Sequence, residues 1–265
     1  MEMDRSTEFD AWSVGQNYEQ YMGRWSRQLA GQFLDWLAPP SSADWLDIGC
    51  GPGALTAAIL ERTEPHAILA LDPSKAFVAY ARAAIQDDRA DFIVGDVATL
   101  PTLASVDIVA SALVLNFLPD RVAALREMHR VLKPGGTLSF YVWDYPGGGM
   151  GMIDAFWKAA AELDQRATAL DEALRFPFCT REGLATLCQD AGLTSPVIEP
   201  IETQTEFADF DAFWHPFTLG AGPAPGYCMS LPVDAREALK RRLAQRLGAG
   251  PIRLAARAWA VKARP

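Results

Sequence analysis

The chain has 265 residues, of which 50% are hydrophobic and 22% are charged. This composition is typical of a globular protein with a sizeable core. The formal net charge of −9 argues against a protein that binds the phosphate backbone of nucleic acids, because such proteins carry a basic stripe. The densest basic run, residues 240–242, is expected on a solvated helix face. We therefore expect no nucleic-acid partner.

The four cysteines and three histidines show no spacing typical of a disulfide framework or a zinc site. The segment from Met1 to Asp10 is polar and acidic, unlike a signal peptide. No apolar run approaches the ~18 residues of a membrane span. We expect a cytoplasmic protein with no metal site and no membrane partner, and the sequence indicates no oligomeric state.

A helix is predicted over residues 16–37, where aromatic and apolar side chains recur at three- and four-residue spacing. Pro39-Pro40 is expected to end it. Residues 1–40 therefore form a separate N-terminal helical segment in this interpretation. The helix could simply pack its aromatic face on the remainder of the chain, or it could act as a lid over a ligand site through Tyr21 and Arg24.

From Trp45 onward, predicted strands and helices alternate. The strands are expected over residues 45–48, 67–71, 91–94, 106–111 and 137–143. Such alternation predicts an α/β fold with a parallel sheet and helices on both faces. Ligands of such sheets bind beyond the carboxyl ends of the strands. The segments expected there are Gly49–Gly53, Asp72, Asp96 and Ala112-Leu113.

The regular alternation stops after the fifth predicted strand. Helices are predicted over residues 150–163 and 181–191, and a third helix is expected to begin with a capping box at Asp234–Glu237. Residues 207–227 are rich in aromatic residues, proline and glycine and are expected to form an ordered loop or cap. Two more strands are predicted, near residues 196–201 and at 252–262.

A glycine-rich turn, residues 49–53, joins the first strand to the next helix. Glycine allows a tight turn and close approach of a ligand, and free N–H groups at the helix N-terminus favour an electron-rich group. Asp72 is expected to accept hydrogen bonds from a ribose diol, or to cap the turn that it begins. Asp96 is expected to accept a hydrogen bond from the adenine amine, or to hold a β-turn.

A nicotinamide-dependent oxidoreductase is the competing interpretation, because residues 49–54 satisfy the relaxed dinucleotide fingerprint G-x-G-x-x-A. Three features argue against it: the additional Gly53, Asp96 after a third strand, and Lys133-Pro134-Gly135-Gly136 before the fifth. The chain is also too short for a conventional separate substrate domain.

Residues 45–143 resemble the core of class I S-adenosylmethionine-dependent methyltransferases, of the type 11 group that includes ubiquinone/menaquinone C-methyltransferases. The segments that carry the resemblance are WLDIGCGPG, LALDPS, FIVGDVATLP, DIVASALVLNFLPD and LREMHRVLKPGGTLSFYVW. The resemblance implies a Rossmann-like, seven-stranded sheet of order 3-2-1-4-5-7-6 with an antiparallel last strand. It also implies a methyltransferase domain over residues 41–265, with cap insertions at about 145–180 and 205–250.

The resemblance further implies S-adenosylmethionine as cofactor, S-adenosylhomocysteine as product, and a set of cofactor-binding residues. These are Gly49, Cys50 and Gly51 along the methionine part, Asp72 at the ribose, Pro73, Ser74, Asp96 and Val97 around the adenine, Leu113 near the sulfonium, and Tyr21 and Arg24 as closing residues. Cys50 is expected only as a small residue that fits the turn. Relatives often have a histidine pair where this chain has Asn116-Phe117, so their substrates are not carried over.

The expected activity is direct SN2 transfer of a methyl group to a small-molecule acceptor, with positioning as the main catalytic device. Residues expected at the acceptor are Asn116, Trp143, Tyr145, Trp157, Trp214 and Tyr227. Their aromatic character favours a small aromatic or apolar acceptor, or a cationic amine. Asp144 and His215 are candidate bases, but a structural role is favoured for both and no catalytic residue is assigned. A protein that binds the cofactor without turnover is a third hypothesis.

Overall fold

The computed structural model of the chain describes residues 19–100, 105–220 and 222–264. The chain divides into two compact units. We call the first the sheet unit (Ser26–Trp143, Phe178–Ile201 and Ala258–Pro265) and the second the helical unit (Met1–Trp25, Asp144–Pro177 and Glu202–Arg257). Three elements, α2, β6 and β7, contribute residues to both units.

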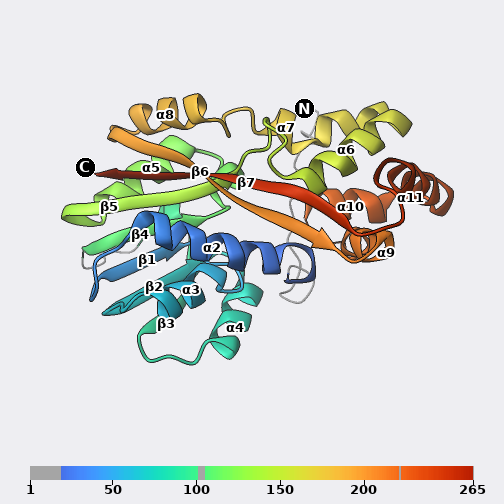
Figure 1. The fold of residues 1–265 in the computed structure, drawn as a ribbon. Helices are drawn as coiled ribbons and strands as arrows, with labels where there is room; N and C mark the ends of the chain where they lie inside the picture. The colour runs from blue at the N-terminus through green and yellow to red at the C-terminus, as the bar shows by residue number, and fades with distance from the viewer. Residues whose placement is uncertain (1–18, 101–104, 221, 265) are drawn as a thin grey trace. The chain divides into compact units, whose positions relative to one another are not determined.

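Seven strands form one sheet in the order β3-β2-β1-β4-β5-β7-β6, and Figure 1 shows them following one another in this order. β1 to β5 are joined by parallel pairing, whereas β7 pairs antiparallel to β5. The predicted sheet order and the antiparallel last strand are confirmed. The strands are β1 (Asp44–Ile48), β2 (Ala67–Asp72), β3 (Ala90–Val94), β4 (Val106–Ala112), β5 (Leu132–Trp143), β6 (Thr194–Phe207) and β7 (Ile252–Arg264).

The helices of the sheet unit begin where a side chain can accept a hydrogen bond from the first turn. Ser74 accepts from the Phe77 N–H before α4, and Asp120 accepts from the Ala123 N–H before α5. α4 packs on β2 and β3, and α5 packs on β5 and α8. The helical segments are α2 (Arg24–Leu37), α3 (Ala54–Arg62), α4 (Lys75–Ala84), η3 (Val97–Thr99), η4 (Leu115–Phe117), α5 (Arg121–Arg130) and α8 (Arg181–Asp190).

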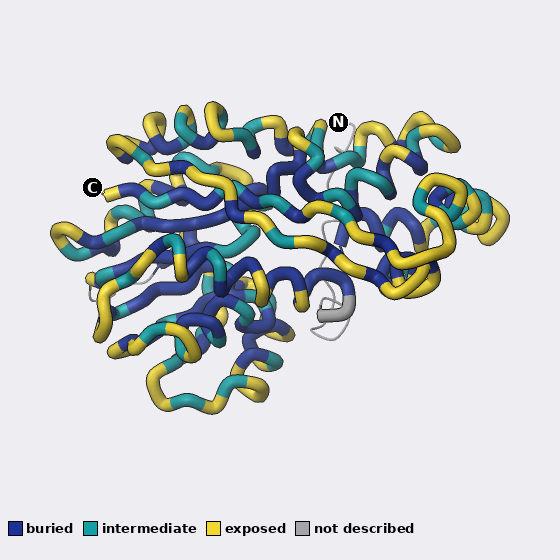
Figure 2. Tube along the Cα trace, viewed as in Figure 1, coloured by how far each residue is buried: buried dark blue, intermediate teal, exposed yellow. Residues whose placement is uncertain are grey.

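The core of the sheet unit lies along its central strands. Leu46, Val109 and Phe140 are fully buried on β1, β4 and β5, and Figure 2 shows these strands as mostly buried. Continuous apolar runs are expected here, because helices cover both faces of a parallel sheet.

The helical unit is built around stacked aromatic rings. The Phe156 ring stacks on Phe217 at a centroid distance of 4.5 Å and meets Tyr227 edge-on at 6.3 Å. Most of α11, in contrast, is intermediate or exposed (Figure 2). The segments of this unit are η2 (Glu19–Gly23), α6 (Gly151–Leu163), η5 (Gln165–Leu170), α7 (Glu172–Arg175), α9 (Phe210–Trp214), η6 (His215–Thr218), α10 (Pro223–Ser230) and α11 (Val233–Leu247).

Several predicted boundaries are wrong. The described part of the first helix is a π-helical turn, η2, followed by α2, and residues 16–18 lie outside the described residues. Residues 207–227, expected as an ordered loop or cap, are largely helical in the part that the structure describes. α10 starts with proline in its first turn, where a missing N–H costs nothing. β5 begins at Leu132, so Lys133–Gly136 belong to the strand.

The capping box predicted at Asp234–Glu237 is also wrong. Helix α11 begins one residue earlier, at Val233, and its N-cap is Pro232, which offers no side-chain hydrogen bond. Asp234 instead lies within the first turn, where its charge is favourable beside the helix dipole. The lid expected over residues 1–40 and the two cap insertions stay predictions, and residues 1–18 lie outside the described part of the chain.

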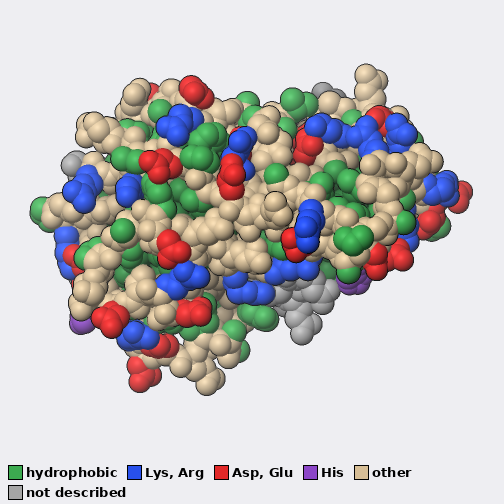
Figure 3. Space-filling model, viewed as in Figure 1, with side chains coloured by type: hydrophobic (Ala, Val, Ile, Leu, Met, Phe, Trp, Pro, Cys, Tyr) green, Lys and Arg blue, Asp and Glu red, His purple; other side chains and the backbone are tan. Residues whose placement is uncertain are grey.

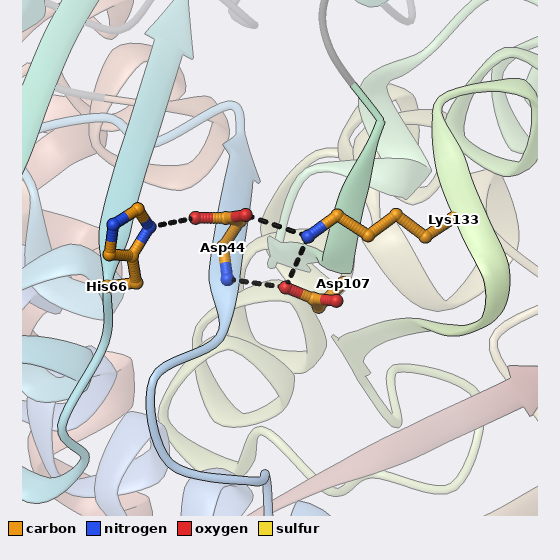
Figure 4. Close-up of polar contacts among 4 residues, drawn as sticks. All are labelled: Asp44, His66, Asp107 and Lys133. Carbon is orange, nitrogen blue, oxygen red and sulfur yellow. Dashed lines mark hydrogen bonds and ion pairs between the residues drawn. The ribbon is translucent and has the colours of Figure 1, made fainter.

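At the amino ends of the strands, four side chains form a polar network (Figure 4). Lys133 Nζ donates to Asp44 at 2.8 Å and to Asp107 at 2.9 Å, and the His66 ring lies 2.6 Å from Asp44. The Asp44 N–H also donates to Asp107. These bonds hold the pKa values of both carboxyls below their usual range. The charged side chains at this end of the sheet are therefore paired with one another.

Within the described part of the chain, no helix is long and apolar enough to cross a membrane. The same residues contain no group of three or more His, Cys, Asp or Glu arranged to hold a metal ion. All four cysteines are free and buried. On the face shown in Figure 3, basic and acidic side chains are interspersed.

Candidate functional site

The carboxyl ends of β1, β2, β3 and β4 meet at one edge of the sheet unit. Ile48 pairs with Leu71, and Asp72 pairs with Val94. On the other side of β1, Asp47 pairs with Ala110. The register therefore brings the glycine turn, Asp72, Asp96 and Leu113 to the same edge, as the strand alternation predicted.

The N–H groups of the glycine turn are used within the protein. Those of Gly49 and Cys50 both donate to the Leu71 carbonyl, at 2.8 and 2.9 Å. The Gly51 N–H donates to Asp72 Oδ2 at 3.0 Å, and the Gly53 N–H donates to the Cys50 carbonyl. Three of these donors are taken up by acceptors at the end of β2. The free N–H groups expected from the sequence belong to the first residues of α3, and that expectation stays a prediction.

Gly51 exposes bare backbone. Its φ of +52° belongs to the left-handed region, and a Cβ added there would meet no protein atom within 4 Å. At Gly49, in contrast, an added Cβ would lie 2.5 Å from a methyl group of Val114. Gly49 is therefore needed for packing, whereas Gly51 leaves room for a ligand to lie against the chain.

The Asp72 carboxylate connects the glycine turn to α4. It is 8% exposed, and its Oδ1 accepts from the Ser74 N–H at 2.8 Å while its Oδ2 accepts from Gly51. Burial raises the pKa of Asp72, and the two backbone hydrogen bonds oppose that rise. Each oxygen keeps a further lone pair for a ligand hydroxyl. Pro73 is exposed, and the Ser74 hydroxyl caps α4.

Asp96 and Val97 follow β3. The Asp96 side chain is exposed, and its Oδ1 accepts from the Ala98 N–H at 2.9 Å. This is the turn-holding role that was the alternative to adenine binding, and one carboxylate can serve both. Val97 is buried as the first residue of η3.

Leu113, directly after β4, has a φ of +62°. A branched side chain seldom adopts this backbone conformation, and such outliers cluster at ligand sites. The Leu113 N–H donates to the Tyr141 carbonyl at 2.9 Å, which holds the conformation. The strand end therefore carries a strained turn where the sulfonium was expected.

Asp47 is a buried acid that sequence reasoning missed. It is fully buried, its Oδ2 accepts from the Thr56 hydroxyl at 2.7 Å, and its Oδ1 has no hydrogen-bond partner among the described residues. Burial raises the pKa of Asp47 to about 7. An acidic residue within the apolar strand Trp45–Ile48 was the signal available in the sequence.

The Cys50 side chain points into the core, where it packs with Ala70, Val78 and Phe92. Burial raises the pKa of its thiol well above the usual range. The thiol is therefore unreactive, in keeping with the expected role of Cys50 as a small residue.

Tyr21 and Arg24 belong to the helical unit. Tyr21 is 1% exposed and meets the Phe217 ring edge-on at 6.0 Å, and its pKa is raised by burial and by the charge of Glu172. The Arg24 guanidinium lies 3.9 Å from the Trp25 ring centroid and 4.9 Å from that of Phe207. Their role as closing residues stays a prediction.

The residues expected at the acceptor are divided between the units. Asn116 and Trp143 belong to the sheet unit, and all six are buried. In the helical unit, Trp157 lies 5.4 Å from the Tyr227 ring. Their contact with an acceptor stays a prediction. The remaining two residues of the helical unit are Tyr145, which lies 5.7 Å from Phe176, and Trp214, which lies 6.3 Å from Phe217.

Neither candidate base, Asp144 or His215, lies in the surroundings that a general base needs. Asp144 is buried, forms an ion pair with Arg257 and accepts from the Gly147 N–H at 3.1 Å. His215 is exposed at the start of η6. A second buried acid, Glu172, was missed; it accepts from the Trp157 indole N–H, and burial raises its pKa to about 8.

Comparison with known proteins matches residues 46–140 to the family described as methyltransferase domain. Trans-aconitate 2-methyltransferase of Enterobacter sp. (strain 638) is 34% identical over 127 residues, 48% of this chain and 49% of that protein. The chain thus spans about half the length of this relative. The enzyme of the same name from Streptomyces avermitilis is 31% identical over 180 residues, 63% of this chain and 66% of that protein.

Among solved structures, the YcgJ protein of Bacillus subtilis shares the fold, with a TM-score of 0.59, 15% identity and coverage of 90% and 99% of the two chains. A chain from a Haloferax volcanii complex that contains the Trm112 methyltransferase activator is 25% identical, with a TM-score of 0.57 and coverage of 97% and 98%. The sheet order, the matched domain and these relatives agree. Residues 46–140 therefore form a methyltransferase domain of the class I, S-adenosylmethionine-dependent type.

Proposed function

We propose that this chain transfers the methyl group of S-adenosylmethionine to a small-molecule acceptor. The observation that carries the proposal is the edge of the sheet unit where the bare backbone of Gly51, the Asp72 carboxylate and the strained Leu113 turn meet. The names of the relatives support a small acceptor, because trans-aconitate is a small organic acid.

The residues at this edge fit S-adenosylmethionine. The open side of Gly51 suits the methionine part, which needs close approach and carries no phosphate. Asp72 keeps lone pairs for the two ribose hydroxyls, while its backbone hydrogen bonds fix its orientation. Asp96 and Val97 are the residues proposed for the adenine, and Leu113 for the sulfonium end.

When bound, S-adenosylmethionine would supply a methyl group that its sulfonium already activates. The acceptor would form the new bond to this carbon with a lone pair, and the electron pair of the broken carbon–sulfur bond would stay on the sulfur of S-adenosylhomocysteine. The chain's own contribution is to hold the two reactants in line, which can lower the barrier by about 7–11 kcal/mol. No residue is assigned as a base, since Asp144 is committed to Arg257.

The charge of the chain bears on the class of acceptor. The interspersed charges in Figure 3 and the net charge of −9 support an acceptor other than nucleic acid. We also propose a cytoplasmic location. Tyr21 and Arg24 are proposed as further cofactor residues, and Tyr145, Trp157, Trp214 and Tyr227 as acceptor residues.

Thermal denaturation with candidate cofactors tests the proposal, since a ligand that binds only the folded state raises the melting temperature. We expect S-adenosylmethionine and S-adenosylhomocysteine to raise it and NAD(H) to leave it unchanged. A rise with NAD(H) alone would favour the oxidoreductase. A screen of small-molecule acceptors for S-adenosylhomocysteine release would then separate an active enzyme from a chain that only binds the cofactor.

A further inference from the structure

Arg121 and Asn116 form a polar pair beside the cofactor edge of the sheet unit. Asn116 lies in η4, three positions after Leu113, and Arg121 is the first residue of α5. Arg121 Nη2 donates to the Asn116 main-chain carbonyl at 2.9 Å. The two residues are thus linked at the end of β4, where the methyl group is expected.

The Arg121 guanidinium is held in place from a second side. It lies 4.4 Å from the Phe178 ring centroid. Phe178 is itself closely packed on α8, because a Cβ at Gly183 would lie 2.4 Å from the Phe178 carbonyl oxygen. Stacking on a ring leaves the edge of a guanidinium, with its N–H donors, available for a planar partner.

Two donors of this pair are buried without an acceptor among the described residues: Nε of Arg121 and Nδ2 of Asn116. Asn116 is 2% exposed. Buried donors in proteins are almost always hydrogen-bonded. Because Arg121 Nη2 keeps the two residues in contact, the two open donors point to a ligand.

Within the described residues, no carboxylate forms an ion pair with Arg121. The nearest acid in the sequence, Asp120, is exposed, and its Oδ1 accepts from the Ala123 N–H to cap α5. The other arginine of the first two turns, Arg126, also donates to a main-chain carbonyl, that of Asp190, but it is exposed. Burial lowers the pKa of Arg121, because the charged form has lost water without gaining an anion.

We propose that Arg121 and Asn116 bind a carboxylate of the methyl acceptor. A carboxylate offers two coplanar oxygens that match the guanidinium N–H edge and an amide N–H. The inference rests on the proposed function, and it replaces the aromatic or cationic acceptor expected from the sequence with an anionic one. Bound there, the acceptor carries its reactive group next to Leu113 and the glycine turn.

Calorimetric titration of the complex with S-adenosylhomocysteine tests this pair without requiring turnover. The probes are succinate, fumarate, citrate and trans-aconitate, each compared with its neutral methyl ester. We expect at least one acid to bind while its ester does not. Arg121→Gln should lower the affinity for that acid about 10- to 100-fold, as expected for the loss of a hydrogen bond to a charged group.

Arg126→Gln is the matched control, because it removes an arginine of the same helix that also donates to a main-chain carbonyl. It should leave binding of the acid unchanged. Asn116→Asp keeps the shape of the side chain while adding a negative charge, so it should remain folded and lose the acid. S-adenosylhomocysteine should bind all three variants as it binds wild type.

The inference is overturned if the wild-type complex binds none of the acids, if an ester binds as tightly as its acid, or if Arg121→Gln and Arg126→Gln behave alike. Failure of the wild type to bind S-adenosylhomocysteine would instead contradict the proposed function. The two failures are therefore distinguishable in one titration series.

Discussion

The two ends of the strands in the sheet unit are built in opposite ways. At the amino end, Lys133 bridges Asp44 and Asp107, and His66 completes the network (Figure 4). At the carboxyl end, Asp47 keeps one oxygen unpaired among the described residues, and Leu113 has a strained φ. The amino end pairs both of its carboxylates with Lys133, whereas the carboxyl end keeps a buried carboxylate oxygen unpaired among the described residues.

This difference indicates where the sheet unit retains capacity for a ligand. Ion pairs on a surface change the free energy of unfolding little in either direction. Unsatisfied buried groups and left-handed non-glycine residues cost about 1–3 kcal/mol each, and they persist where function requires them. The comparison therefore predicts that substitutions at the carboxyl end change cofactor binding, while those at the amino end change stability alone.

The largest expected effect concerns Asp47. Its folded pKa of about 7 exceeds the usual 3.8, so the folded state binds a proton more readily than the unfolded state. The free energy of unfolding should then rise as the pH falls from about 7 to about 4, by an amount on the order of 4 kcal/mol. Asp47→Asn should remove this rise while Glu172, which has a similar pH dependence, stays in both proteins.

Urea unfolding of wild type and Asp47→Asn across this pH range measures the difference between them. Equal pH dependence in the two proteins would mean that Asp47 is ionised normally in the fold.

Asp72→Ala removes the acceptor of the Gly51 and Ser74 N–H groups and the proposed partner of the ribose hydroxyls. We expect about 10- to 100-fold weaker binding of S-adenosylhomocysteine and a loss of about 1–3 kcal/mol in the free energy of unfolding. Calorimetric titration and urea unfolding measure the two effects. Unchanged affinity in a folded variant would remove Asp72 from the site.

Gly51→Ala and Gly135→Ala compare the two ends at equal backbone cost. Both glycines have positive φ, +52° and +80°, and neither has a protein atom within 4 Å of an added Cβ. Each substitution should lower the free energy of unfolding by about 1–2 kcal/mol. Only Gly51→Ala should also lower the affinity for S-adenosylhomocysteine, by about 10-fold, because the added methyl group occupies space that the ligand needs. Similar affinity in both variants would contradict the close approach at Gly51.

The smallest effect is expected for Lys133→Met, which breaks both ion pairs at the amino end. The melting temperature should fall slightly, and less so at high salt, where exposed charges are screened. Because the folded pKa values of Asp44 and Asp107 are lowered, the stabilisation should be lost as the pH falls through those values.

Lys158→Met, which removes an exposed lysine of α6 and breaks its single pair with Asp154, is the reference for this change. Affinity for S-adenosylhomocysteine should equal that of wild type in both lysine variants. A loss of affinity in Lys133→Met would contradict the division of roles between the two ends.

Strand–helix alternation predicted a parallel sheet and the residues at the carboxyl ends of its strands. The strand order was predicted by the resemblance to class I methyltransferases. The sequence did not predict which acceptors the N–H groups of the glycine turn bind, because that depends on the register between β1 and β2. Arg121 was missed because an arginine in the first turn of a helix is ordinary. Only the contact with Phe178, distant in sequence, makes it unusual.

Hydrogen exchange of the backbone with and without S-adenosylhomocysteine tests the central claim most directly. We predict that the ligand slows exchange at residues 49–56, 72–74, 96–98 and 113–116, and leaves residues 44, 66, 107 and 133–136 unchanged. Protection confined to the amino-end residues, or no protection in the sheet unit, would contradict the assignment of the carboxyl end as the cofactor site.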